Sequence, residues 1–242
     1  MKVLDLFSGI GGFSLGLEWA GMETIAMCEK DKFCRQVLAK HWPDITIHED
    51  IRDLNGKDYK GSIDVVCGGF PCQPFSVAGK QLGKADDRHL WPEMLRVIKE
   101  SAPAWVIGEN VSGFVGMALD DVCSDLEGEG YRVQSFIIPA CAVEAHHRRD
   151  RCWVVAYSES ERVQRLRSCG LEESHAHGPA LLPLCEGKGF GSTYWETEPD
   201  VDRVVDGVPN RVDRIKSLGN AVVPQLVQRI GEMIYAEHQR CG

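Results

Sequence analysis

A cysteine stands between two prolines in the segment Gly68-Gly-Phe-Pro-Cys-Gln-Pro-Phe-Ser76, directly after the apolar run Ile63 to Val66. A lone cysteine is more often a small buried hydrophobe than a nucleophile. A loop rich in glycine and proline is poor core material, however, and it follows a predicted strand at the sheet edge where open α/β sheets bind ligands. Because the thiolate is the reactive form of cysteine, Cys72 is a candidate nucleophile.

A second segment, Asp5-Leu-Phe-Ser-Gly-Ile-Gly-Gly-Phe13, predicts a strand, a glycine turn and a helix. Glycines at such a turn let a ligand approach the backbone at a helix N-terminus. Glu29 ends the next predicted strand, where a carboxylate can bind ribose hydroxyls. The G-x-G-G spacing differs from the dinucleotide G-x-G-x-x-G and favours S-adenosylmethionine over NAD. A purely structural glycine turn is the alternative.

The elements that must position these residues alternate along the first 156 positions, a pattern typical of βαβ units and a mainly parallel sheet. Periodicity then fails between residues 157 and 205, which form either a long loop or a small inserted recognition module. A C-terminal helix is predicted over 221–238. The strands are predicted at 3–7, 23–28, 63–66, 105–107, 133–138 and 152–156, and the other helices at 11–20, 33–41, 91–100 and 118–129.

Length and composition fit one α/β domain with a small appendage: 242 residues, 43% of them hydrophobic. The net charge of −9 argues against an indiscriminate nucleic-acid coat. No apolar run has the length of a signal peptide or a bilayer span, so we expect a soluble cytoplasmic protein. We expect ten reduced cysteines and no metal, because the one candidate zinc cluster lacks a C-x2-C pair. Its members are Cys169, His175, His177 and Cys185.

Several segments together resemble the DNA cytosine-5 methyltransferase family. Its Pro-Cys-Gln signature is intact at Cys72, and its Phe-x-Gly-x-Gly-Gly signature runs from Phe7 to Gly12. The departure is at His147, where the family's Gln-x-Arg-x-Arg motif has glutamine; histidine also donates or accepts hydrogen bonds. The remaining matches, in chain order, are Asp50-Ile51, Arg88-His89-Leu90, Glu109-Asn110-Val111, Arg149-Asp150-Arg151 and Gly219-Asn220-Ala221-Val222.

The resemblance implies a Rossmann-like, S-adenosylmethionine-dependent methyltransferase sheet with a small inserted target-recognition region. Residues 1–156 and 207–242 would form the catalytic domain, and residues 157–206 the recognition region. The implied catalytic residues are Cys72, Glu109, Arg149 and Arg151. The implied cofactor-binding residues are Phe7, Gly9, Gly11, Gly12, Glu29, Asp50, Ile51, Pro71, Leu90, Asn220 and Val222. The implied substrate-binding residues are Gln73, Ser76, Asn110, Val111 and His147.

The implied reaction is methyl transfer from S-adenosylmethionine to C5 of a flipped-out cytosine in double-stranded DNA. We expect a monomer with no obligatory protein partner and no membrane contact. The compact form resembles those carried by phages and prophages, which indicates a bacterial or phage-infected cell. Three alternatives stay open: a tRNA cytosine-5 methyltransferase with the same Pro-Cys-Gln arrangement, a regulatory protein that binds the cofactor without catalysis, and a dehydrogenase.

Overall fold

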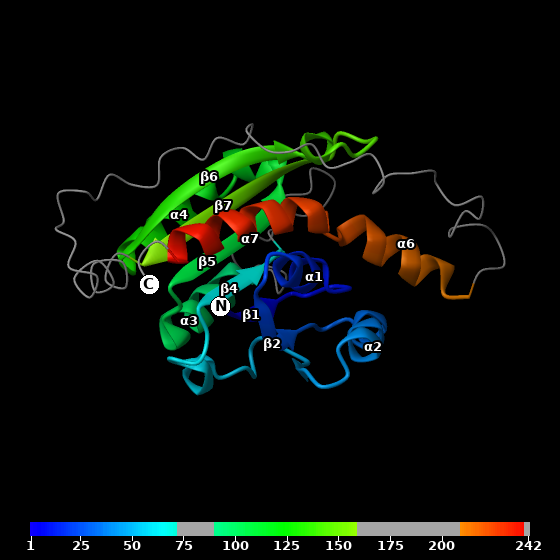
Figure 1. Ribbon diagram of the computed structural model, residues 1–242, viewed down its shortest axis with the longest axis horizontal. Helices are drawn as coiled ribbons and strands as arrows, with labels where there is room; N and C mark the ends of the chain where they lie inside the picture. The colour runs from blue at the N-terminus through cyan, green and yellow to red at the C-terminus, as the bar shows by residue number, and fades with distance from the viewer. Residues whose placement is uncertain (72–89, 159–208, 240–242) are drawn as a thin grey trace, which may run out of the picture.

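A seven-stranded sheet runs through the molecule in the order β3-β2-β1-β4-β5-β7-β6 (Figure 1). The computed structural model describes residues 1–71, 90–158 and 209–239. Strands β1 to β5 are parallel, whereas β7 runs antiparallel to both β5 and β6. This is the predicted Rossmann-like α/β class. The strands are β1 (Lys2–Leu6), β2 (Glu23–Cys28), β3 (Thr46–His48), β4 (Val65–Gly68), β5 (Trp105–Val111), β6 (Tyr131–Pro139) and β7 (Asp150–Ser158).

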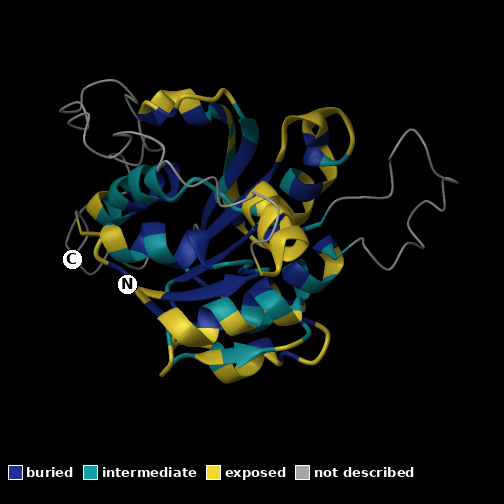
Figure 2. Cartoon of the chain, turned by 90° about the vertical axis from the view of Figure 1, so that its right-hand side faces the viewer, coloured by how far each residue is buried: buried dark blue, intermediate teal, exposed yellow. Residues whose placement is uncertain are grey.

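Helices cover both faces of this sheet. Strand residues therefore alternate between two cores: Leu4, Val66 and Val106 in one, and Val3 and Ile107 in the other. Figure 2 shows the buried strands beneath helices whose outer faces are exposed. The first core is covered by α3 (Trp91–Ser101) and α4 (Leu119–Gly128), and the second by α1 (Gly12–Trp19) and α7 (Pro224–Gln239). The other helices are α2 (Lys32–His41) and α6 (Arg211–Asn220), with 3-10 turns at Gly56–Tyr59, Ser112–Gly116 and Ala140–Val143.

The C-terminal helix packs closely against the first helix of the chain. A Cβ added at Gly16 would lie 2.5 Å from the carbonyl oxygen of Pro224, and one added at Gly231 would lie 2.8 Å from the Cβ of Ala20. Any larger side chain at these positions would push α1 and α7 apart. This contact brings residues just before α7 next to the turn that precedes α1.

The largest differences between the structure and the sequence prediction concern four elements. Strand β3 and helix α6 were not predicted, β5 extends to Val111 rather than ending at Ile107, and α7 begins at Pro224 rather than at Ala221. A three-residue strand is too short to show periodicity, and proline is well suited to a first helical position. The recognition region of residues 157–206 lies almost wholly outside the described residues, so its boundary stays a prediction. No helix in the described part of the chain is long and apolar enough to cross a bilayer.

Candidate functional site

The glycine turn joins β1 to α1 in a tight left-handed path. Gly9 and Gly11 have φ of 55° and 89°, and the non-glycine residue Phe7 has φ of 56°. A Cβ at Gly11 would lie 2.5 Å from the Trp42 ring, so only glycine fits there. A Cβ at Gly9 would meet no atom within 4 Å. The turn is therefore closed on one side and open on the other, where a ligand can approach the backbone.

Glu29 follows β2, and its carboxylate points at this turn. Its Oε2 accepts from the backbone N–H of Gly9 at 2.7 Å, and its Oε1 accepts from the N–H of Asp31 at 2.7 Å. Each carboxylate oxygen has a second lone pair for another donor, such as a ribose hydroxyl. The open space at Gly9 and the chemistry of Glu29 thus fit an adenosine-containing cofactor.

Asp5 lies under the same turn. It was not among the site residues predicted from the sequence. It is fully buried, and its Oδ2 accepts from the hydroxyl and the backbone N–H of Ser14 at 2.6 and 3.2 Å. Helix α1 has no side-chain cap at Gly11, so Asp5 satisfies first-turn donors from the strand instead. Burial raises the pKa of Asp5 to about 7 against the opposing effect of the Ser14 hydrogen bonds. An aspartate preceding a glycine turn is the signal that could have found it.

Asp50 and Ile51 follow β3 at the same edge of the sheet. The carboxylate of Asp50 accepts from the N–H of Arg52 at 3.1 Å and from Lys30 Nζ at 3.0 Å. The Arg52 N–H and Lys30 together hold its pKa below the usual range. Ile51 is buried, and Leu90 is half-buried where α3 begins. Arg88 and His89 lie outside the described residues.

The start of the cysteine loop is held in place at the end of β4. Asn110 is buried, and its Nδ2 donates to the carbonyl of Phe70 at 2.9 Å. The Phe70 ring packs on Trp91 and Phe114, with centroids 4.9 and 5.5 Å away. These contacts hold Phe70, the residue before Pro71, in place. Cys72, Gln73 and Ser76 lie outside the described residues, so their roles stay predictions.

Glu109 forms a buried ion pair near the end of β5. The antiparallel register pairs Glu109 with Trp153, so Arg151, two residues before Trp153, lies diagonally across from it on the same face. Arg151 Nε lies 2.8 Å from Glu109 Oε1, and the two side chains are 20% and 10% exposed. Burial raises the pKa of Glu109 to about 7, although Arg151 and Arg149 lower it. Glu109 can therefore hold a proton near neutral pH.

The two arginines of the Arg149-Asp150-Arg151 segment have different contacts. Arg149 Nη2 donates to the carbonyls of Gly219 and Ala221 at 2.7 and 2.9 Å. Burial and the neighbouring charge of Arg151 lower the Arg149 pKa. Arg151 pairs with the site carboxylate, whereas Arg149 binds the C-terminal part of the chain.

The remaining predicted residues lie at the same edge. Val222 packs on the glycine turn, because a Cβ added at Gly12 would lie 2.8 Å from Val222 Cγ2. Asn220, at the end of α6, is exposed, as are Val111 after Asn110 and His147 before β7. The fold thus brings residues 220–222 to a turn that lies some two hundred positions earlier in the chain.

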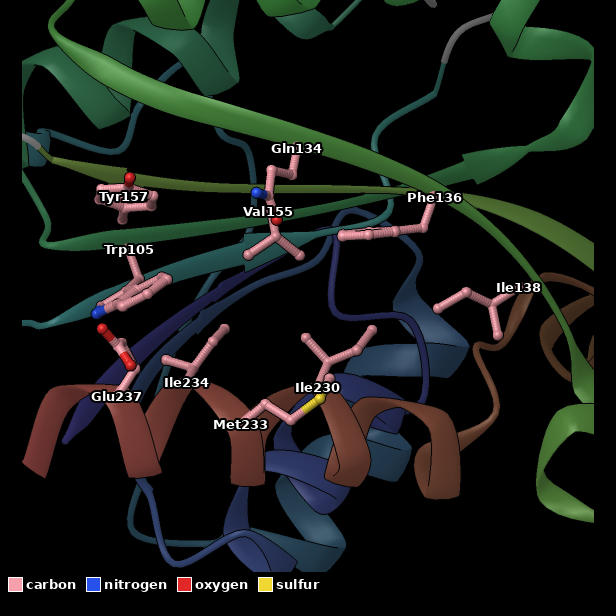
Figure 3. Close-up of a pocket in the computed structure, with 10 residues that line it drawn as sticks. All are labelled: Trp105, Gln134, Phe136, Ile138, Val155, Tyr157, Ile230, Met233, Ile234 and Glu237. Atoms are coloured by element: carbon pink, nitrogen blue, oxygen red, sulfur yellow. The ribbon is translucent and has the colours of Figure 1, made fainter. Parts of the chain in front are cut away.

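A separate pocket lies between α7 and the β5, β6 and β7 strands (Figure 3). None of the described site residues lines it. Its walls are mostly apolar, with Glu237 and Gln134 as polar exceptions. The lining residues are Trp105, Gln134, Phe136, Ile138, Val155, Tyr157, Ile230, Met233, Ile234 and Glu237. This hollow belongs to the packing of α7 on the sheet and is distinct from the glycine-turn site.

Metal ligands do not cluster in the part of the chain that the structure describes: no group of three or more His, Cys, Asp or Glu residues there could hold an ion. The cluster of Cys169, His175, His177 and Cys185 lies outside the described residues.

The sheet order and the glycine-turn edge define a Rossmann-like methyltransferase fold. A family model described as C-5 cytosine-specific DNA methylase matches residues 1–181, so the chain belongs to that family.

Comparison with individual proteins agrees with this family. The Type II methyltransferase M.PspPI of Psychrobacter is 38% identical over 64% of this chain and 39% of its own length. M.HhaI of Haemophilus parahaemolyticus is 30% identical over 69% and 52%. The structure of a putative DNA modification methyltransferase encoded within an Escherichia coli prophage matches with 27% identity and a TM-score of 0.56, covering 67% of this chain and 48% of that one. The matched part therefore spans about two fifths to one half of these relatives.

Proposed function

We propose that the protein transfers a methyl group from S-adenosylmethionine to C5 of cytosine in double-stranded DNA. The observation that carries this proposal is the buried pair of Glu109, in β5, and Arg151, in β7, which lies beside Gly69, the residue that follows β4. Family membership and the Type II methyltransferase relatives support the same reaction.

The cofactor would be held by the glycine turn and Glu29, with Val222 packing against Gly12 from the C-terminal side. Asp50, Ile51 and Leu90 would lie around its adenine. Bound there, S-adenosylmethionine supplies an electrophilic methyl group. The chain's own residues must then make the cytosine ring nucleophilic.

C5 of cytosine is a poor nucleophile, so the ring needs covalent activation. The Cys72 thiolate adds to C6, forming a C–S bond and moving electron density toward N3 and C5. Glu109 donates its proton to N3, and Arg151 holds its carboxyl group in place. This stabilises the charge that develops in the transition state. Methylation of C5 would break the S–CH3 bond of the cofactor and leave S-adenosylhomocysteine. A base then removes the C5 proton, the electron pair restores the C5–C6 double bond and expels the Cys72 thiolate, and N3 returns its proton to Glu109.

The target base would leave the helix for this reaction, because C6 of a base that is paired and stacked inside a duplex is out of reach of a protein nucleophile. Residues 157–206 would select the DNA sequence. That assignment rests on the loss of α/β periodicity there and on the cationic residues Arg162, Arg165 and Arg167.

The test is methyl transfer by the full chain to duplex DNA and, separately, to tRNA, with Cys72→Ser as the matched variant. We expect transfer to DNA, a covalent adduct with DNA that contains 5-fluorocytosine, and loss of both in Cys72→Ser with cofactor binding kept, since serine is a far weaker nucleophile. Substantial turnover by Cys72→Ser would contradict the covalent mechanism. Transfer to tRNA alone would favour the RNA-modifying alternative.

A further inference from the structure

Arg149 joins two parts of the chain that are far apart in sequence. It directly precedes β7, yet its guanidinium donates to the carbonyls of Gly219 and Ala221, 70 and 72 residues further on. Those two carbonyls flank Asn220, at the end of α6. The side chain is thus directed toward the C-terminal segment.

The end of α6 offers good acceptors for a cation. The last carbonyls of a helix have no partner within the helix and carry partial negative charge. The last turn of α6 contains no basic residue of its own. Arg149 supplies this charge from another element, and hydrogen bonds from a charged donor are the stronger kind.

The backbone conformation of Arg149 indicates that the surrounding structure holds this residue in one position. Its φ of 37° lies in the left-handed region, which is disfavoured for a non-glycine residue. Such a conformation persists where the surroundings over-determine it. The neighbouring Arg148 carbonyl accepts from the N–H of Ala140 at 2.6 Å, which ties this segment to the end of β6.

The segment that Arg149 binds is held on its other side by the glycine turn and α1. Val222 lies against Gly12, and the Pro224 carbonyl lies against Gly16. Before it, α6 is attached to α2, where Ser217 Oγ lies 3.4 Å from Cys34 Sγ. Residues 219–224 therefore pass beside the turn that Glu29 also contacts.

We propose that Arg149 is a positioning residue, which holds residues 219–221 beside the glycine turn and thereby completes the cofactor pocket from the C-terminal side. The Arg149 guanidinium contacts the segment beside the cofactor pocket, whereas Arg151 contacts Glu109, the proposed partner of the target base. This inference rests on the proposed function, since it assumes that the glycine turn binds S-adenosylmethionine.

The test compares Arg149→Met and Arg149→Lys with the control Arg148→Met in the full chain. Arg148 is the next residue, is 82% exposed and pairs with Asp150 at 3.0 Å, so its loss removes an equal charge without touching residues 219–221. Three quantities are measured: hydrogen exchange of residues 217–223 without cofactor, the affinity for S-adenosylmethionine by calorimetry, and kcat and KM for the cofactor at saturating DNA.

For Arg149→Met we expect faster exchange at residues 217–223 and cofactor affinity weaker by on the order of 10- to 100-fold, from the loss of two charge-assisted hydrogen bonds. The KM for the cofactor should rise, whereas kcat at saturating cofactor should stay near that of the wild type when both are measured well below pH 7, where Glu109 is protonated with or without the Arg149 charge. Arg149→Lys, which keeps the charge but lacks the fork, should lie between. Arg148→Met should match the wild type in exchange and cofactor affinity.

Unchanged exchange and cofactor affinity in Arg149→Met would overturn the proposal, and a simultaneous loss of the 5-fluorocytosine adduct would place Arg149 at the base instead. If Arg149→Met does not fold, Arg149→Lys decides by the same measurements. If the wild type neither binds S-adenosylmethionine nor methylates DNA, the proposed function fails. Independently of that result, unchanged hydrogen exchange in Arg149→Met would show that Arg149 does not hold residues 219–221.

Discussion

Two carboxylates near the same edge of the sheet have opposite environments. Asp50, after β3, accepts from the Arg52 N–H and from Lys30, and these donors hold its pKa below the usual range. Glu109, in β5, is buried, and burial raises its pKa to about 7 even with Arg151 beside it. The first carboxylate is a permanent acceptor, whereas the second can exchange a proton near neutral pH.

This difference suits the two carboxylates to different tasks at the same sheet edge: Asp50 to ligand binding and Glu109 to proton transfer. Groups that only bind a ligand work best with a fixed charge, whereas an acid catalyst works best with a pKa near the operating pH. Burial gives Glu109 in β5 a pKa near neutral pH, because it disfavours the charged carboxylate more strongly than Arg151 and Arg149 favour it. We therefore expect substitutions around the glycine turn to change cofactor affinity, and substitutions of Glu109 or Arg151 to change the rate of methyl transfer.

The largest effect is expected from Glu109→Ala. It removes the proposed proton donor to N3, and general acid catalysis contributes about 10²- to 10⁴-fold, so kcat should fall by that order. Affinity for S-adenosylmethionine should stay unchanged, as measured by calorimetry. Glu129→Ala, which removes a surface partner of Lys99 far from the site edge, is the control and should keep full activity. A loss of cofactor affinity as large as the loss of rate would show that Glu109 acts in cofactor binding as well as in the chemical step.

Glu29→Ala should have a smaller effect, on the cofactor side. The Gly9 N–H loses its acceptor, and the ribose would lose the carboxylate that we propose binds it, so cofactor affinity should fall by on the order of 10- to 100-fold. At saturating cofactor, the 5-fluorocytosine adduct should still form. Calorimetry and the adduct yield on denaturing gels check the two halves of this prediction. Wild-type affinity in Glu29→Ala would show that the carboxylate serves only the turn.

The smallest effect is a shift in pH dependence on Arg151→Gln. In the proposed mechanism only protonated Glu109 donates to N3, so the rate should fall as pH rises above about 7 in the wild type. Arg151 favours the charged carboxylate, and its removal raises the Glu109 pKa further. The alkaline limb should therefore move to higher pH by about 1 to 2 units, whatever the maximal rate. The pH profile of kcat measures this shift, and a limb that moves to lower pH would show that another group controls it.

Much of the site could be predicted from contiguous segments. The glycine turn after β1, Glu109 in β5 and the Gly219 to Val222 segment at the end of α6 each carry their signal in a few adjacent residues, as does Cys72, which lies outside the described residues. The alternation of apolar runs predicted the α/β class in the same way. Helix α6 had a signal that went unused: Val212, Ile215 and Leu218 have helical spacing, although all three are exposed.

The partners of these residues depend on contacts that no local pattern encodes. Both arginines before and in β7 were candidates for the base, and only the antiparallel register with β5 pairs Arg151 with Glu109. Arg149 reaches Gly219 and Ala221 because α7 packs on α1 through Gly16 and brings that segment to the sheet edge. Residue types and their spacing therefore determined which groups are candidates for the site. Strand register and helix packing, which are set by burial across the whole chain, decided which charge faces which partner.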